Sequence, residues 1–352
     1  MFEKLYKKIF PIIKFFPPEL AHNLAIKFFS NFKKEITSDD PMLNTKVCNL
    51  QFTNPIGLAA GFDKNGEACE GLICLGFGFV EIGTITINPQ YGNKKPRIFR
   101  LLEDKAIINR LGFNNVGAEK VLENIQNSDI VNSSSLLGIN LGKNLDSKHP
   151  FEDYVKLLRI FNKKASYITL NISSPNTPDL RKLEQKDNLD KLVKKISSFK
   201  RKNSINVPVF IKIDPDLSRN ELGDIADIIL SSSIEGVIIS NTSIHRSSDL
   251  INKNANQKGG ISGLPIKTKS NQLLKDFYIL TNGKIPLIGV GGISTGKDAY
   301  ERILNGASLI QLYTALVYKG PSVVNNIKEE LIYLLKKDNY KSIDKAVGKL
   351  NK

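Results

Sequence analysis

The chain has 352 residues, 41% of them hydrophobic, and a formal net charge of +15. This size and composition suit a soluble globular enzyme with a large core, built as one barrel or as two ordinary domains. Its lysines are spread along the chain, which argues against a nucleic-acid partner, and its three cysteines and three histidines lack the spacing of a disulfide framework, a metal site or a His-based triad.

Residues 1–40 differ from the rest of the chain. Large apolar side chains recur there at helical spacing, first at Phe2, Leu5, Tyr6, Ile9, Ile12, Ile13 and Phe16, then at Leu20, Ala21, Leu24, Phe28 and Phe32. We expect two amphipathic helices, with Pro11 kinking or ending the first and Pro17-Pro18 beginning the second. No apolar run approaches the ~20 residues of a transmembrane span, and Lys14 and the prolines argue against a secretory signal.

Two interpretations of these helices remain open. They either pad the main domain or lie in a membrane interface, with apolar side chains in the lipid and lysines toward anionic head groups. In both cases we expect the chain to divide into an N-terminal helical extension, 1–40, and a main domain, 41–352.

From residue 55 onward, short apolar runs alternate with helical patterns. The predicted strands are Ile56–Ala60, Phe79–Gly83, Leu137–Leu141, Tyr167–Leu170, Val209–Ile213, Gly236–Ser240, Pro286–Gly289 and Ser308–Leu312. The predicted helices lie near Glu67–Leu75, Val116–Gln126, Phe151–Phe161, Leu189–Lys202, Asn220–Leu230, Lys267–Leu280, Lys297–Asn305 and Ser322–Leu335. Eight such units indicate an α/β fold, a (β/α)8 TIM barrel rather than an open doubly wound sheet. Two stretches, Ile85–Arg110 and Ser173–Lys186, are longer than ordinary connections and are candidate substrate or lid elements.

In such a barrel the functional groups lie just past the C-terminal ends of the strands. The sequence places polar residues or glycines at those ends, namely Gly61, Asp63, Lys64, Thr84, Asn140, Lys143, Asn171, Ser174, Lys212, Asn241, Thr242, Gly291, Gly292, Tyr313 and Thr314. The richest segment is Asn171–Pro178, in which two prolines and several short polar side chains fix the shape of the loop. Each of these residues taken singly has a structural alternative; Lys212, for example, could instead pair with Asp214 or Asp216.

Two turns predict an anion site. Gly289-Val290-Gly291-Gly292 follows the seventh strand and precedes a helix, so backbone N–H groups and the positive end of that helix are available to an anion. Tyr313-Thr314, after the eighth strand, adds donors, and phosphate groups commonly bind between these two loops in such barrels. Gly259-Gly260-Ile261-Ser262-Gly263 lets backbone approach the same ligand closely. We therefore expect a phosphorylated cofactor here.

These segments resemble the dihydroorotate dehydrogenase family, in one unbroken order from about residue 18 to 335. The resemblance is carried by Gly57–Lys64, Glu81–Thr84, Ile108–Asn114, Asn171–Pro178 and Gly289–Ile293. Ser174 stands where class 1 members of that family carry cysteine. The amphipathic N-terminal helices are typical of class 2, the membrane-associated, quinone-reducing type, so the resemblance implies class 2.

The resemblance implies FMN-dependent oxidation of (S)-dihydroorotate to orotate in pyrimidine synthesis, with electrons passed to a membrane quinone. It assigns FMN contacts to Ala60, Gly61, Thr84, Asn140, Asn171, Lys212, Ser240, Gly263, Gly292, Tyr313 and Thr314. It assigns substrate contacts to Lys64, Asn109, Arg110, Leu111, Gly112, Phe113, Asn171, Asn176, Asn241 and Thr242. His22 and Arg100 are placed at a quinone tunnel between the N-terminal helices. The implied location is peripheral, on the cytoplasmic face of the inner membrane; the oligomeric state stays open.

For the chemistry, we expect hydride transfer from substrate C6 to flavin N5 while Ser174 takes the C5 proton. Because serine is a weak base, we expect a relay through Thr177 and a water under the Ser173–Lys186 lid. Three alternatives remain: a class 1-type enzyme with a soluble acceptor, a Schiff-base aldolase in which Lys212 attacks a carbonyl, and a non-enzymatic membrane-surface module. A flavin spectrum separates the two flavoenzymes from the other two.

Overall fold

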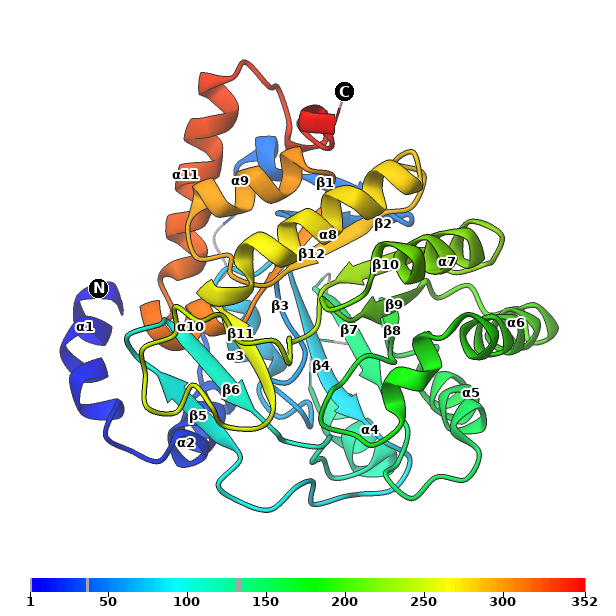
Figure 1. Ribbon diagram of the computed structural model, residues 1–352. Helices are drawn as coiled ribbons and strands as arrows, with labels where there is room; N and C mark the ends of the chain where they lie inside the picture. Colours follow the sequence, from blue (N-terminus) through cyan, green and yellow to red (C-terminus); the bar gives the residue numbers. More distant parts are fainter. Residues whose placement is uncertain (1, 36–37, 129, 131–134, 352) are drawn as a thin grey trace.

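The computed structural model describes residues 2–35, 38–128, 130 and 135–351, and its centre is a closed barrel of eight parallel strands (Figure 1). The strands follow one another around the ring in chain order, and the last pairs with the first, Ile310 beside Ile56. They are β3 (Ile56–Leu58), β4 (Phe79–Ile85), β7 (Leu136–Leu141), β8 (Tyr167–Asn171), β9 (Val209–Ile213), β10 (Gly236–Ile239), β12 (Leu287–Val290) and β13 (Leu309–Leu312). The predicted TIM barrel is therefore confirmed, with small shifts in the strand bounds.

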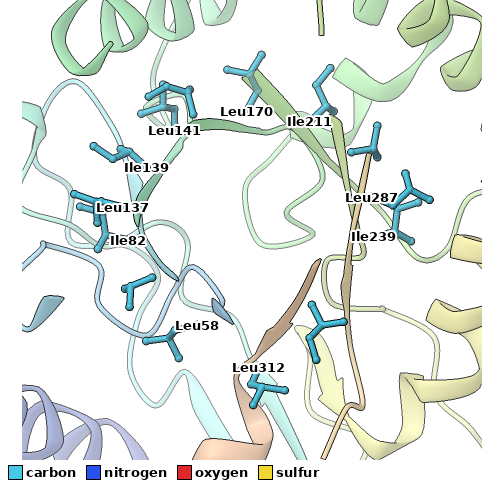
Figure 2. Packing of buried hydrophobic residues seen from close by; sticks show 14 of the residues in the cluster. Leu58, Ile82, Leu137, Ile139, Leu141, Leu170, Ile211, Ile239, Leu287 and Leu312 are labelled. Atoms are coloured by element: carbon cyan, nitrogen blue, oxygen red, sulfur yellow. The ribbon is translucent and has the colours of Figure 1, made fainter. Parts of the chain in front are cut away.

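Helices cover the outside of the barrel. They are α3 (Cys69–Ile73), α4 (Ala118–Gln126), α5 (Pro150–Phe161), α6 (Lys186–Lys202), α7 (Arg219–Leu230), α8 (Lys267–Leu280), α9 (Gly296–Leu304), α10 (Thr314–Lys319) and α11 (Val323–Lys337). The strands present an aliphatic layer to them, and Figure 2 labels ten of its side chains around the ring of strands. The short helix α10, directly after the eighth strand, is the one that the sequence pattern did not predict.

The interior of the barrel is filled by large rings packed against glycines. At its N-terminal end, Phe79, Tyr167 and Phe210 form an edge-to-face chain with ring centroids 6.1 and 5.3 Å apart. A Cβ atom at Gly57 or Gly138 would lie 2.3 or 2.2 Å from one of these rings, so only glycine leaves room for them. The N-terminal half of the barrel is therefore a packed core.

Five strands outside the barrel were not predicted. β5 (Ile98–Leu101), β6 (Ala106–Asn109) and β11 (Gly260–Gly263) form an antiparallel sheet beside the barrel mouth, and β1 (Thr45–Val47) and β2 (Leu50–Phe52) form a hairpin. The long connection Ile85–Arg110, for which the sequence pattern predicted no strand, thus contains β5 and β6 in its second half. The side of this sheet near α2 contributes one wall of the site described below.

The two N-terminal helices are α1 (Phe2–Ile13) and α2 (Pro18–Ser30). Pro11 lies inside α1 and does not end it, because in the last turn its missing N–H removes a single hydrogen bond. α2 packs closely on α3: a Cβ atom at Gly71 would lie 1.9 Å from the carbonyl oxygen of Phe29. α1 contacts α10, where Tyr6 donates to the Val317 carbonyl at 2.6 Å. Among the described residues, no helix has the length and apolar character needed to cross a bilayer.

Candidate functional site

A cavity of about 1080 Å³ extends from the N-terminal helices to the C-terminal mouth of the barrel. One end is lined by apolar side chains of α1 and α2 and of the turn between them, among them Leu5, Ile9, Ile12, Phe16, Leu24 and Phe28. The other end is lined by polar residues at the strand ends. The cavity therefore joins an apolar passage to a polar chamber at the position where a TIM barrel carries its functional groups.

Most of the predicted site residues line this one cavity. From the predicted cofactor set they are Ala60, Gly61, Thr84, Asn171, Lys212, Ser240, Gly263, Gly292, Tyr313 and Thr314. From the substrate set they are Lys64, Asn109, Leu111, Gly112, Phe113, Asn171, Asn176, Asn241 and Thr242, and Ser174, His22 and Arg100 line it as well. The structure places Asn140, Arg110 and Thr177 outside the lining.

Asn140 lies one layer below the cavity wall. Its side-chain oxygen accepts a hydrogen bond from Thr84 Oγ1 at 2.7 Å, and Thr84 Oγ1 in turn accepts one from Asn171 Nδ2 at 3.0 Å. The amide nitrogen of Asn140 donates to Glu81 Oε1 at 2.7 Å. Asn140 therefore orients two lining residues and does not itself face the cavity.

A fully buried carboxylate, Glu81, organises the layer beneath the cavity. Besides Asn140, it accepts hydrogen bonds from the Tyr167 hydroxyl at 2.8 Å and from Gln311 Nε2 at 2.7 Å. Burial lowers the pKa of Lys212, and the nearby Glu81 carboxylate opposes that shift. Glu81 and Gln311 were absent from the predicted site, although each is a lone polar residue inside an apolar run, which is the signal that could have found them.

Ser174 lies in the wall of the polar chamber, held by the loop around it. Its hydroxyl accepts the backbone N–H of Asn176 at 3.3 Å, and the side chain of Asn176 reaches Asn109 Oδ1 at 3.3 Å. Asn241 Nδ2 donates to Asn171 Oδ1 at 3.1 Å. Four amide side chains therefore converge near Ser174, an arrangement suited to a flat ligand rich in donors and acceptors.

Thr177 belongs to the same loop but does not line the cavity. Its hydroxyl is buried, and among the described residues it has no hydrogen-bond partner, which is unusual for a buried polar group. The sequence did not predict that the loop is anchored farther along by Arg181, whose guanidinium pairs with Asp214 at 2.5 Å and donates to the Thr242 carbonyl at 3.4 Å. The predicted lid is thus tied to the ends of β9 and β10.

Lys64 connects the polar chamber with the apolar passage. Its ammonium group lies 3.3 Å from His22 Nε2 on α2. Burial lowers the pKa of Lys64 to about 8, with Glu19 and Asp63 opposing the shift. Burial and, after it, the charge of Lys64 hold the pKa of His22 well below its usual value, so His22 is neutral and accepts the hydrogen bond.

The two predicted arginines differ in placement. Arg100 lies in the passage and donates to the carbonyl of Ile13 at 3.0 Å and to that of Phe16, which ties the α1–α2 turn to β5. Arg110 instead donates to the Pro96 carbonyl at 2.9 Å and stacks over the Phe99 ring. Its guanidinium therefore binds the loops beside the cavity and not the cavity itself.

The glycine turn after β12 lies in the cavity wall, but the helix that follows it does not offer its N-terminus. Asp298 Oδ2 accepts the backbone N–H groups of Ser294 and Thr295, both at 2.9 Å, and Glu330 accepts that of Gly296 at 2.6 Å. The expectation that the positive end of this helix awaits an anion is therefore wrong, since two carboxylates already occupy it. Gly291 and Gly292 remain as the candidate donors.

Three comparisons point to one family. The family model described as Dihydroorotate dehydrogenase matches residues 42–335. "Dihydroorotate dehydrogenase (quinone)" of Rhodospirillum rubrum is 42% identical, covering 97% of this chain and 94% of the relative. The mitochondrial quinone enzyme of Mus musculus is 43% identical, covering 94% of this chain and 86% of the relative. A crystal structure of DHODH from Eimeria tenella in complex with ferulenol, 38% identical, superposes with a TM-score of 0.91 over 95% of this chain and 96% of that one.

Proposed function

We propose, since the chain belongs to the dihydroorotate dehydrogenase family, that it oxidises (S)-dihydroorotate to orotate in pyrimidine synthesis and passes the electrons to a quinone. The observation that carries this proposal is the single cavity that joins a polar chamber to an apolar passage. Its volume of about 1080 Å³ slightly exceeds the ~300–1,000 Å³ of a typical small-molecule pocket, which suits more than one ligand. The class 1, aldolase and membrane-module alternatives are not favoured.

FMN is the cofactor that the chamber fits best. Lys212 supplies a buried cation at one wall, and Gly292 and Thr314 lie in the wall where the loops after the seventh and eighth strands meet. Bound there, FMN would accept a hydride from the substrate and pass the electrons on to the quinone. The residues of the chain would hold it, with Thr84 and Asn171 already oriented from below by Asn140.

The substrate end of the chamber is assigned to the amides around Ser174. Asn109, Asn171, Asn176 and Asn241 would bind the carbonyl and N–H groups of the substrate ring, because each amide offers both a donor and an acceptor. Ser174 would take the proton from C5 and pass it on through a relay of Thr177 and a water.

The apolar passage is assigned to the quinone. His22 and Arg100 lie in it, and exposed apolar side chains of α1 and α2 surround its far end. We infer that residues 1–40 form a separate functional part that meets the membrane, while 41–352 form the FMN-binding barrel. Exposed lysines at positions 4, 7, 8 and 14 suit an anionic surface, which supports a peripheral site on the cytoplasmic face of the inner membrane.

A visible spectrum tests the proposed function. The purified protein is expected to be yellow, and anaerobic addition of dihydroorotate is expected to bleach the flavin band. A decyl-tailed quinone added afterwards is expected to restore it. A colourless protein that FMN cannot reconstitute would reject the proposal, and trapping of a substrate carbonyl on Lys212 by borohydride would support the aldolase instead.

Substrate affinity is expected to fall above pH 8. Lys64 has a pKa of about 8. Below that pH its charged ammonium attracts the substrate carboxylate, and above it the side chain loses its proton and this attraction. The dissociation constant of dihydroorotate, taken from the concentration dependence of anaerobic flavin reduction, should rise several-fold between pH 7.5 and 9.5. Lys64→Met is the control, with weak binding that no longer changes over this range. A wild-type constant independent of pH would contradict the assignment of Lys64.

A further inference from the structure

Arg302 of α9 is a buried cation that the proposed function leaves without a role. It is 1% exposed, and among the described residues no carboxylate lies within ion-pair distance of its guanidinium. Buried charges are usually paired, because removing an ion from water is costly. Burial lowers the pKa of Arg302 to about 10, so the group stays protonated at neutral pH. The role of this buried cation is therefore to be found in what its guanidinium is bonded to.

The guanidinium is bonded to the back of the glycine turn after β12. Arg302 Nη2 donates to the Gly291 carbonyl at 2.8 Å, and Nη1 donates to Ser270 Oγ at 2.8 Å. Ser270 Oγ donates in turn to the Val290 carbonyl at 2.5 Å. Two consecutive carbonyls of the turn are thus held on the side away from the cavity, since neither Arg302 nor Ser270 is among its lining residues.

The planarity of the peptide fixes what faces the cavity. In a trans peptide the C=O and the N–H of the same unit point in opposite directions. With the carbonyls of Val290 and Gly291 held at the back, the N–H groups of Gly291 and Gly292 face forward, and both residues line the cavity. The turn needs glycine for this shape, with φ of +111° and +72°. Two successive N–H groups form a small anion-binding concavity.

The carboxylates of Glu301 and Asp298 favour the charged form of Arg302 from a distance, but among the described residues neither forms an ion pair with it. Lys267 pairs with Asp298, whose second oxygen caps α9, and Glu330 accepts the N–H of Gly296. Lys319 donates to the Ser294 carbonyl at 2.7 Å. With Glu301, three carboxylates and three cations lie around the turn, and Arg302 is the cation bonded directly to its Gly291 carbonyl. A positive charge on a carbonyl also polarises the peptide and strengthens its N–H as a donor.

We propose that Arg302 is a positioning residue for the phosphate monoester of the cofactor, acting through the Gly291–Gly292 turn without touching the ligand. This inference rests on the proposed function, in which the cofactor is FMN. It predicts that Arg302 matters for the phosphate and not for the flavin ring, which distinguishes it from an ordinary structural brace.

Binding of FMN and of riboflavin to the apoprotein tests the proposal. Arg302→Gln keeps a hydrogen-bond donor but removes the charge. It is expected to lower the affinity for FMN at least tenfold and to change the affinity for riboflavin less than twofold. Arg302→Lys keeps the charge and is expected to retain most of the FMN affinity. Arg159→Gln, which removes an exposed arginine of α5 stacked on Phe199, is the matched control and should change neither ligand. Quenching of the flavin fluorescence on binding gives the dissociation constants of FMN and riboflavin for the wild type and each variant.

The outcomes separate clearly. Three results would each overturn the proposal. In the first, Arg302→Gln lowers the affinity for FMN and for riboflavin equally; in the second, it lowers neither; in the third, Arg159→Gln lowers the affinity for FMN as much. If Arg302→Gln does not fold, Ser270→Ala replaces it, because it removes the hydroxyl that links the guanidinium to the Val290 carbonyl. A several-fold loss of affinity for FMN alone supports the proposal. Equal losses of affinity for FMN and riboflavin, or no loss, overturn it. Failure of the wild-type apoprotein to bind FMN would instead reject the proposed function.

Discussion

Ser174→Ala is expected to leave FMN bound and to slow flavin reduction by dihydroorotate by about 100-fold or more, the usual scale for losing a positioned acid or base. The hydroxyl lies in the chamber wall, where the N–H of Asn176 already donates to it. That bond occupies one lone pair and holds the oxygen in place, which favours proton acceptance on the other. Anaerobic stopped-flow reduction of the flavin measures the effect without the quinone step.

Two further variants sharpen this test. Ser174→Cys is expected to recover part of the rate, with a pH profile shifted to lower pH, because a thiol ionises more readily than a hydroxyl. Ser231→Ala is the control, since it removes an exposed serine hydroxyl at the end of α7 that donates to the carbonyls of Asp227 and Ile228. Reduction at the wild-type rate in Ser174→Ala would show that another group takes the C5 proton.

The barrel could be predicted from sequence because its strands are continuous apolar runs that end abruptly in polar residues. Tyr167–Asn171 illustrates this, with an amide at the last position of the strand. The antiparallel sheet could not be predicted in the same way. β5 and β6 are joined by a turn at Leu102–Lys105 with no Gly or Asn-Gly signal, and their third partner, β11, lies about 150 residues farther along the chain.

The site was predictable mainly where a polar residue stands at the end of a strand. Gln311, inside β13, lines the cavity and was still missed. Asn171 and Lys212 follow from their places at strand ends. Glu81 is buried in the middle of a strand, and its role in the site depends on the hydrogen bonds that Tyr167 and Gln311 donate to it across the barrel. Arg302, in the helical run Glu301-Arg302-Ile303, has the pattern of a solvated helix face, and only the fold shows that it is buried. Spacing in sequence carries no information on such long-range pairs.

The two N-terminal helices are attached to the barrel to different extents. α2 buries Ile26 and Phe29 and lies against the backbone of α3, so its removal would open the barrel wall. α1 is attached more lightly, through Tyr6, Phe10 and the bond from Arg100 to the Ile13 carbonyl. Its apolar side chains are half exposed, with Leu5 at 50% and Ile12 at 61%. A deletion limited to residues 1–16 therefore tests the passage without disturbing the core.

Deletion of residues 1–16 is expected to leave flavin reduction by dihydroorotate near the wild-type rate, because every proposed FMN and substrate contact lies after residue 54. Turnover with a long-tailed quinone is expected to fall at least tenfold, and binding to vesicles of anionic phospholipid to be lost. The physical reason is that each large apolar side chain buried against a quinone tail or lipid contributes about 1.5–3 kcal/mol, and the deletion removes Leu5, Ile9 and Ile12 together with Phe16. Tyr333→Ala is the control, an exposed aromatic of α11 that does not line the cavity. Unchanged quinone turnover and vesicle binding would reject the passage as the quinone route, whereas loss of FMN would show that α1 supports the barrel itself.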